Sequence, residues 1–191
     1  MLETIQYWDE VILFAINNTH TPFWDKFMLF VSRKQTWYIF YAILLFCLYK
    51  SYPLKNVGIK ILIIVLLITL ADRFSSGFCK PYFKRYRPCY DVNLAPKLQV
   101  PEKAGSQYGF ISSHAANSFA IAMIFGLWLK PRKYWLTGML FWATLISYSR
   151  VYLAVHYTTD VIVGGITGVI FAFICYKFAK VLEEKLVFSN Q

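Results

Sequence analysis

The chain has 191 residues, of which 58% are hydrophobic and 19% are aromatic, and its formal net charge is +10. Because a soluble domain is roughly 45–50% apolar, this composition excludes an ordinary soluble fold and predicts one domain, residues 1–191, embedded in a lipid bilayer. The basic residues are scattered among apolar segments and form no continuous stripe, which argues against nucleic acid as a partner. The N-terminal residues have no basic region and no small-residue cleavage site, so we expect no signal peptide.

Two short apolar stretches, residues 11–16 and 27–31, come first along the chain, and polar residues 17–19 and Pro22 interrupt them. Neither is long enough to cross a bilayer, which takes about 20 residues. We therefore expect an N-terminal segment of amphipathic or half-inserted helices at the membrane interface, with a full crossing as the alternative. His20 lies in this region without an evident partner and is interpreted as an ordinary interfacial residue.

Five longer apolar segments follow, and they predict an all-α integral membrane bundle with about five to six transmembrane helices. They cover residues 37–49, 57–78, 115–129, 134–148 and 161–178. The second and the last segments are long enough to span a bilayer. The other three reach that length only when the aromatic and polar residues at their ends are included. Gly164 and Gly168 form a small-x-x-x-small pair on the last segment, which would let a neighbouring helix approach closely.

Three polar clusters lie at the ends of these segments. They are Lys80 with Arg87-Pro88, then Ser112-Ser113-His114, and finally Ser149-Arg150 with His156 and Asp160. If each segment between them crosses once, all three clusters lie on the same side of the membrane. Titratable side chains at a membrane are costly to place and generally functional. The clusters therefore predict one shared site.

The first cluster has residue types that suit phosphate binding. Lys80 and Arg87 would face the same way if the backbone between them were helical, and arginine offers a planar fork for phosphate oxygens. A basic patch that touches lipid headgroups is the alternative, and it is our interpretation of the neighbouring Lys84 and Arg85.

The other two clusters add an anion site and a candidate nucleophile. Ser112 and Ser113 precede a helix whose N-terminal amides could bind an anion, although simple capping is the alternative. Asp160 follows His156 by four residues and could fix the tautomer of its imidazole, as expected of a nucleophile with an orienting carboxylate. Arg150 could hold phosphate oxygens during the attack.

Together these motifs resemble those of the type-2 phosphatidic acid phosphatase superfamily, which also includes vanadium haloperoxidases. Residues 80–88 match its K-x6-R-P motif, residues 112–114 resemble P-S-G-H, and residues 149–160 match S-R-x5-H-x3-D. Ile111 replaces the proline of the second motif and Ser113 replaces its glycine, but we expect activity to survive because the serine and histidine positions are intact. With its flanking helices, the resemblance covers about residues 57–180.

The resemblance implies hydrolysis of a phosphomonoester or pyrophosphate on a membrane lipid through a phosphohistidine, with release of inorganic phosphate. His156 would be the nucleophile, Asp160 would orient it, and His114 would protonate the leaving alkoxide and later activate water. The groups implied to bind the phosphoryl oxygens are Lys80, Arg87, Ser112, Arg150 and the amide of Ser113.

Several alternatives stay open for the reaction. The candidate substrates are undecaprenyl diphosphate, a lipid A phosphate, phosphatidylglycerophosphate and phosphatidate. The resemblance implies neither a metal nor a cofactor, and the sequence has no Cys/His cluster with zinc spacing. A membrane phosphotransferase that uses the same histidine, or a non-enzymatic membrane protein, are the other possible functions. The apolar spans disfavour a haloperoxidase.

Charge and cysteine positions bear on the side of the membrane that the site faces. Lysines and arginines flank the two turns opposite the site, at positions 50, 55, 60, 130, 132 and 133. The positive-inside rule predicts that these turns are cytoplasmic, so that the site faces the periplasm or the outside of a bacterial inner membrane, although basic residues on the site's own side weaken the count. Cys79 and Cys89 bracket the first cluster, and an outward position would permit a disulfide between them.

Overall fold

The computed structural model describes residues 2–99 and 105–188, and the regular elements of these two stretches are all helical, as predicted. The α-helices are α1 (Leu2–Asn17), α2 (Pro22–Ser32), α3 (Tyr38–Ser51), α4 (Leu54–Asp72), α5 (Lys80–Phe83), α6 (Ser113–Trp128), α7 (Arg132–Tyr152) and α8 (Thr158–Phe188). The other helical segments are the 3₁₀ turns η1 (Lys34–Trp37), η3 (Pro88–Tyr90) and η4 (Ala95–Lys97) and the π-helical segment η2 (Arg73–Cys79).

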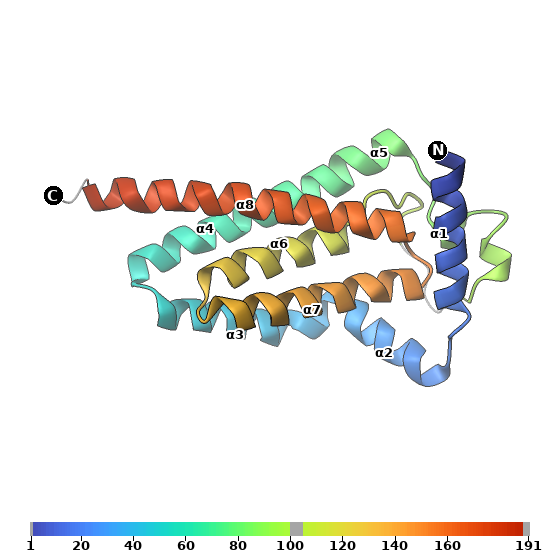
Figure 1. Ribbon diagram of the computed structural model, residues 1–191, viewed down its shortest axis with the longest axis horizontal. Helices are drawn as coiled ribbons and strands as arrows, with labels where there is room; N and C mark the ends of the chain where they lie inside the picture. The colour runs from blue at the N-terminus through green and yellow to red at the C-terminus, as the bar shows by residue number, and fades with distance from the viewer. Residues whose placement is uncertain (1, 100–104, 189–191) are drawn as a thin grey trace.

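The bundle is built around α6, which is the most deeply buried helix. Helices α3, α4, α6, α7 and α8 run lengthwise, and α6 packs mainly against α7 and α8 (Figure 1). The side chains of α6 are small on much of its surface, with Ala115, Ala116, Ala120 and Ala122 fully buried. Small residues let neighbouring helices approach closely, so α6 can be surrounded on several sides.

Helix α8 approaches α6 through the two glycines that the sequence marks as a packing pair. A Cβ atom placed on Gly168 would lie 2.1 Å from the carbonyl oxygen of Ala116, and one on Gly164 would lie 2.6 Å from that of Ser112. Both positions therefore require glycine for backbone-to-backbone contact, which confirms the packing interpretation. The contact also sets the N-terminal ends of α6 and α8 side by side, where the amide of Ser112 donates to the carbonyl oxygen of Asp160 at 3.0 Å.

The N-terminal region divides into two parts. Helix α1 lies across one end of the bundle, the orientation expected of an interfacial helix, whereas α2 slants toward η1 and α3 and continues lengthwise (Figure 1). Thr21 caps α2 by accepting a hydrogen bond from the amide of Trp24, and Pro22 suits its first turn.

The interpretation of His20 as a residue without a partner is wrong. Its Nδ1 lies 2.6 Å from the carboxylate of Asp25, and its ring stacks on Tyr152 with 4.2 Å between ring centroids. The sequence hides this contact because it forms only when the turn between α1 and α2 folds against the end of α7.

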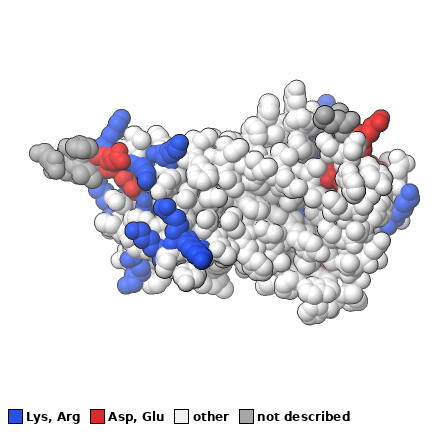
Figure 2. All heavy atoms as spheres, in the orientation of Figure 1, with Lys and Arg blue, Asp and Glu red and all other residues white. Residues whose placement is uncertain are grey.

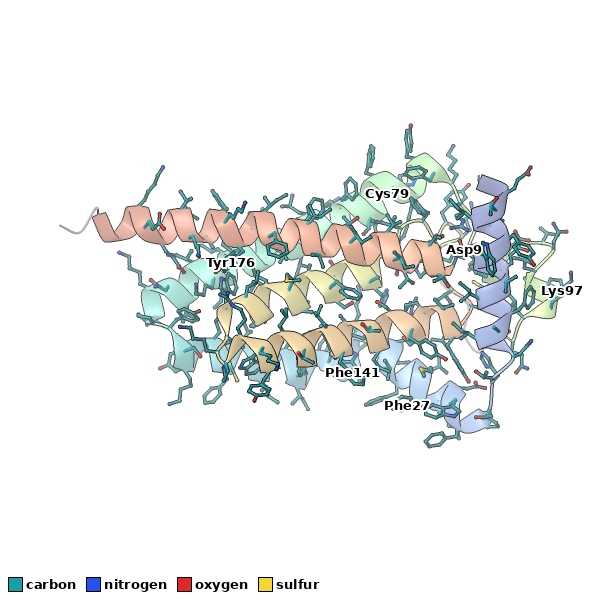
Figure 3. The ribbon with its side chains drawn as sticks, in the orientation of Figure 1. Asp9, Phe27, Cys79, Lys97, Phe141 and Tyr176 are labelled. Carbon is teal, nitrogen blue, oxygen red and sulfur yellow. The ribbon has the colours of Figure 1, made fainter. Side chains whose placement is uncertain are left out.

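Two helices of the described residues are long and apolar enough to cross a membrane, Leu54–Phe83 and Thr158–Lys185. The first joins α4, η2 and α5 into one continuous helix. Helix α3, with 14 residues, is about 21 Å long, shorter than the roughly 30 Å of a bilayer's hydrocarbon core. Large apolar side chains are nevertheless exposed along the bundle, including Ile39 at 77%, Leu62 at 71% and Phe141 at 71% (Figure 3).

Candidate active site

A cavity of about 700 Å³ lies among the helices of the bundle. It brings together residues of all three polar clusters, although these are far apart in the sequence. The predicted site residues that line it are Lys80, Arg87, Ser113, His114, Arg150 and His156. Apolar residues of α3, α4, α6 and α7 form much of the remaining wall, which also includes the charged side chains of Lys34 and Asp72. The cavity therefore has a basic end and a largely apolar wall along the rest of its length.

The other two predicted site residues, Ser112 and Asp160, are fully buried behind this wall. Ser112 is the N-cap of α6, and its hydroxyl accepts from the amide of Ala115 at 3.4 Å. The side chain of Ser112 therefore caps the helix, which is one of the two roles that the sequence left open. Asp160 lies in the first turn of α8 and faces His156.

His156 lies in the short connection between α7 and α8, and only 1% of it is exposed. Its Nδ1 lies 3.3 Å from Oδ2 of Asp160, and its Nε2 lies 2.7 Å from Nη1 of Arg87. Because a guanidinium can only donate, Nε2 accepts, and the proton of a neutral ring sits on Nδ1 toward the carboxylate. The unprotonated Nε2 is therefore the atom available to attack.

The surroundings of His156 also keep the ring neutral. Burial lowers the pKa of His156 well below its usual value, and the positive charges of Arg87, Arg150 and Lys80 lower it further. A neutral imidazole is the nucleophilic form, so the surroundings of His156 suit nucleophilic attack, and the same cations suit the binding of an anion.

Arg87 is held rigidly at the base of the cavity, where it is 5% exposed. Its Nε donates to the carbonyl oxygen of Ser106 at 2.7 Å, and its Nη1 donates to that of Val155 at 2.8 Å. The backbone between Lys80 and Arg87 does not meet the condition of being helical, because α5 ends at Phe83 and Lys84 takes a left-handed conformation with φ of 48°. Both cations nevertheless line the same cavity.

Lys80 and Arg150 each donate a hydrogen bond to a serine outside the sequence motifs, Ser76 and Ser32 respectively. The ammonium of Lys80 donates to the hydroxyl of Ser113 at 2.7 Å and to that of Ser76 at 3.2 Å. Nη1 of Arg150 donates to the hydroxyl of Ser32. Ser113, which stands in place of the motif's glycine, thus contributes a hydroxyl at the cavity wall.

The two cysteines that bracket the first cluster, Cys79 and Cys89, are both buried free thiols, so the possible disulfide is not formed.

The interpretation of Arg85 as part of a lipid-facing basic patch is wrong, because its Nη1 donates to Asp160 at 2.9 Å.

Gly109 fits tightly against His156 and the residues that contact it. A Cβ atom at this position would lie 3.0 Å from Oδ2 of Asp160, 3.1 Å from Cγ of Arg87 and 3.5 Å from Nδ1 of His156. The sequence offers one signal for this residue, a glycine three positions before the helix cap Ser112.

We expect Gly109→Ala to lower kcat by about a hundredfold, since a displacement of reacting groups by about 1 Å has effects of this size. The added methyl group must push Asp160 or Arg87 away from His156. Steady-state kinetics of purified variants would measure the loss, with Gly138→Ala as the control because nothing lies within 4 Å of a Cβ at that position, which is outside the cavity wall. An equal loss in both variants would contradict the argument.

A helical bundle that places a buried histidine beside a carboxylate and a cluster of cations has the groups that suit phosphoryl transfer. The chain belongs to the PAP2 superfamily, whose model matches residues 60–183.

Comparisons with individual proteins agree with this assignment. The chain is 37% identical over 191 residues to lipid A 4'-phosphatase from Bacteroides thetaiotaomicron, which covers 96% of this chain and 84% of the relative. The crystal structure of LpxE from Aquifex aeolicus superimposes with a TM-score of 0.64 at 25% identity, covering 87% of this chain and 93% of that one. A transmembrane PAP2-type phosphatidylglycerolphosphate phosphatase from Bacillus subtilis has the same fold, with a TM-score of 0.72 at 21% identity and coverage of 95% and 87%.

Proposed function

We propose that this protein hydrolyses a phosphomonoester on a membrane lipid, with a lipid A-type phosphate as the first candidate substrate. The observation that carries the proposal is the placement of Nε2 of His156, backed by Asp160 and facing a cavity with basic and apolar parts. The likeness to a lipid A 4'-phosphatase over nearly the whole chain supports the choice of lipid.

The reaction proceeds in two steps. Nε2 of His156 attacks phosphorus, so that a P–N bond forms while the bond to the lipid oxygen breaks, and His114 gives a proton to the leaving alkoxide. Water, from which His114 then takes a proton, attacks the phosphohistidine and releases inorganic phosphate. Lys80, Arg87 and Arg150 neutralise the phosphoryl oxygens throughout, so fixed donors supply the charge stabilisation and we expect no metal requirement.

The shape of the cavity suits a lipid. Its apolar wall includes Tyr41 and Leu44 of α3 and Ile64 and Ile68 of α4, which lie beyond the basic end. An acyl chain bound along this wall would place its phosphate at the cations, and burial of each methylene group would add about 0.8 kcal/mol to binding.

For the membrane arrangement we propose five crossings. Helices α2 and α3 together form the first, the continuous α4–α5 helix forms the second, and α6, α7 and α8 form the others, with α1 on the membrane surface. Figure 2 shows lysines and arginines gathered at the end opposite the site and a broad uncharged band between the ends. By the positive-inside rule, that end is cytoplasmic and the site faces the periplasm.

A phosphate-release assay on purified protein tests the proposed function. The panel is lipid A, phosphatidylglycerophosphate, phosphatidate and undecaprenyl diphosphate in detergent micelles, with EDTA in the buffer. We expect release of inorganic phosphate, fastest from lipid A. Transfer of the phosphoryl group to another lipid without free phosphate would identify a phosphotransferase instead, and activity that appears only when a divalent ion is added would overturn the metal-independent mechanism.

Single cysteines test the orientation of the site. Lys97, on η4 near the site end, and Lys133, at the start of α7, are both exposed (Lys97 is labelled in Figure 3). In a background without the four native cysteines, we expect an impermeant maleimide to label Lys97→Cys in intact cells and Lys133→Cys only after lysis. The reverse pattern would place the site in the cytoplasm, and labelling of both in intact cells would contradict the proposed crossings.

A further inference from the structure

Arg85 forms a bridge between the surface helix α1 and the carboxylate behind the nucleophile. Its Nη1 donates to Oδ1 of Asp160 at 2.9 Å and to the hydroxyl of Thr159 at 2.7 Å. Its Nη2 donates to Oδ2 of Asp9 at 2.7 Å and to Oε1 of Gln6 at 2.8 Å. Both terminal nitrogens are thus engaged with α8 on one side and α1 on the other.

The two oxygens of Asp160 have separate partners. Oδ1 accepts from Arg85, whereas Oδ2 faces Nδ1 of His156 at 3.3 Å and accepts from the amide of Tyr157 at 3.1 Å. This division fixes the rotation of the carboxylate about its own axis. Because Asp160 is fully buried, its negative charge also needs a nearby cation, and Arg85 forms an ion pair with it.

Asp9 holds the opposite side of the guanidinium. It projects from α1 toward the bundle (Figure 3), and it is 1% exposed although α1 is a surface helix. Its Oδ1 accepts from the amide of Thr159 at 2.9 Å, and its Oδ2 accepts from the hydroxyl of the same residue. The ring of Tyr157 supports the guanidinium from one face, with 4.1 Å between Cζ and the ring centroid.

We infer that Arg85, held by Asp9 of α1, is a positioning residue that fixes Asp160 and thereby His156 for phosphoryl transfer. The inference rests on the phosphatase activity proposed above. It gives α1 a role in the reaction, because the helix at the membrane surface holds one side of the guanidinium whose other side holds the carboxylate. Arg85 itself does not line the cavity with the phosphate-binding cations.

If Arg85 had a purely structural role and only held α1 against the bundle, the expected results would differ. Asp9→Asn loosens α1 but leaves the contact between Arg85 and Asp160, whereas Arg85→Gln removes both. If Arg85 only fastened α1, the two variants would lose activity equally and in proportion to the loss of folded protein. If it positions Asp160, Arg85→Gln has the larger effect on each folded molecule.

The experiment measures kcat, KM and the pH dependence of kcat on the panel lipid that the wild type hydrolyses fastest. We expect Arg85→Gln to lower kcat by about tenfold to a hundredfold with KM changed by less than about twofold, as for a misplaced nucleophile. Asp9→Asn should lower kcat only a few-fold. Lys84→Gln, which removes a neighbouring exposed cation, is the matched control and should behave like the wild type.

The pH dependence of kcat separates the two roles, because attachment of α1 alone does not change the pKa of His156. The charged or titratable groups around His156 are Arg87, Lys80, Arg150 and His114 on the cavity side, where Lys34 and Asp72 also line the wall, and Asp160 with Arg85 behind. Without Arg85 the charge of Asp160 is unbalanced, so the pKa of His156 rises and the acidic limb moves to higher pH. Asp9→Asn removes a negative charge and should not move the limb upward.

Several results would overturn the inference. They are equal kcat values for Arg85→Gln and the wild type, a change confined to KM, an unmoved acidic limb, or an equal loss in Lys84→Gln. If Arg85→Gln does not fold, Arg85→Lys decides by the same kcat criterion, because lysine keeps the charge but lacks the fork that reaches both carboxylates. A wild type that releases no phosphate from any panel lipid would instead contradict the proposed function.

Discussion

Replacing His156 with alanine is expected to abolish phosphate release, with kcat lower by at least about 10⁴-fold, as when a nucleophile is removed from other hydrolases. The reason is geometric, since Nε2 of His156 is the unprotonated ring nitrogen, which accepts from Arg87, and Nδ1 of the same ring has a carboxylate behind it. After rapid quenching, the wild type incubated with radiolabelled substrate should carry labelled protein, and the variant should carry none.

Two further variants make this expectation specific. Asp160→Asn keeps the nucleophile and disturbs its orientation and charge, so its loss of activity should be smaller than that of His156→Ala. His20→Ala removes a histidine outside the cavity, and activity per folded molecule should persist. Substantial turnover by His156→Ala, with the protein folded, would remove the phosphohistidine mechanism.

The convergence of the three clusters could be predicted from the sequence because a membrane limits the possible arrangements. Once a segment crosses the bilayer, its ends are on opposite sides, and the number of crossings between two motifs decides whether they meet. The contact between His156 and Asp160 was also accessible, since residues four apart near a helix start are neighbours. The glycine pair on α8 likewise follows from its spacing.

The support around these residues could not be predicted because it depends on contacts that are distant in the sequence or on local backbone turns. Arg85 faces Asp160 because Lys84 turns the chain out of the helix with a positive φ, and no periodicity signals such a turn. Asp9 is 150 positions from Thr159, and it accepts a hydrogen bond from the amide of that residue. This contact forms only when α1 lies across the end of the bundle. Without these contacts, the basic run around Arg85 indicates only a lipid-facing patch.

His114 gives the last large expected effect, and it depends on the substrate. A lipid alkoxide is a poor leaving group that needs a proton, so His114→Ala should lower kcat on a lipid phosphate by about 10²–10⁴-fold, the range for general acid catalysis. An aryl phosphate such as para-nitrophenyl phosphate releases a stable phenolate and needs no proton in the first step. With this substrate the variant should still form the phosphohistidine.

The second step then becomes limiting, because water still requires a base to attack the phosphohistidine. We therefore expect His114→Ala to show a burst of para-nitrophenolate of about one equivalent per active site, followed by slow turnover, as when a covalent intermediate accumulates. Stopped-flow absorbance measures the burst, and the labelled intermediate can be counted after quenching. His114 lines the cavity within the set of cations, so a role limited to phosphate binding is the competing explanation. That role predicts equal losses on both substrates and no burst, and such a result would assign proton transfer to another group.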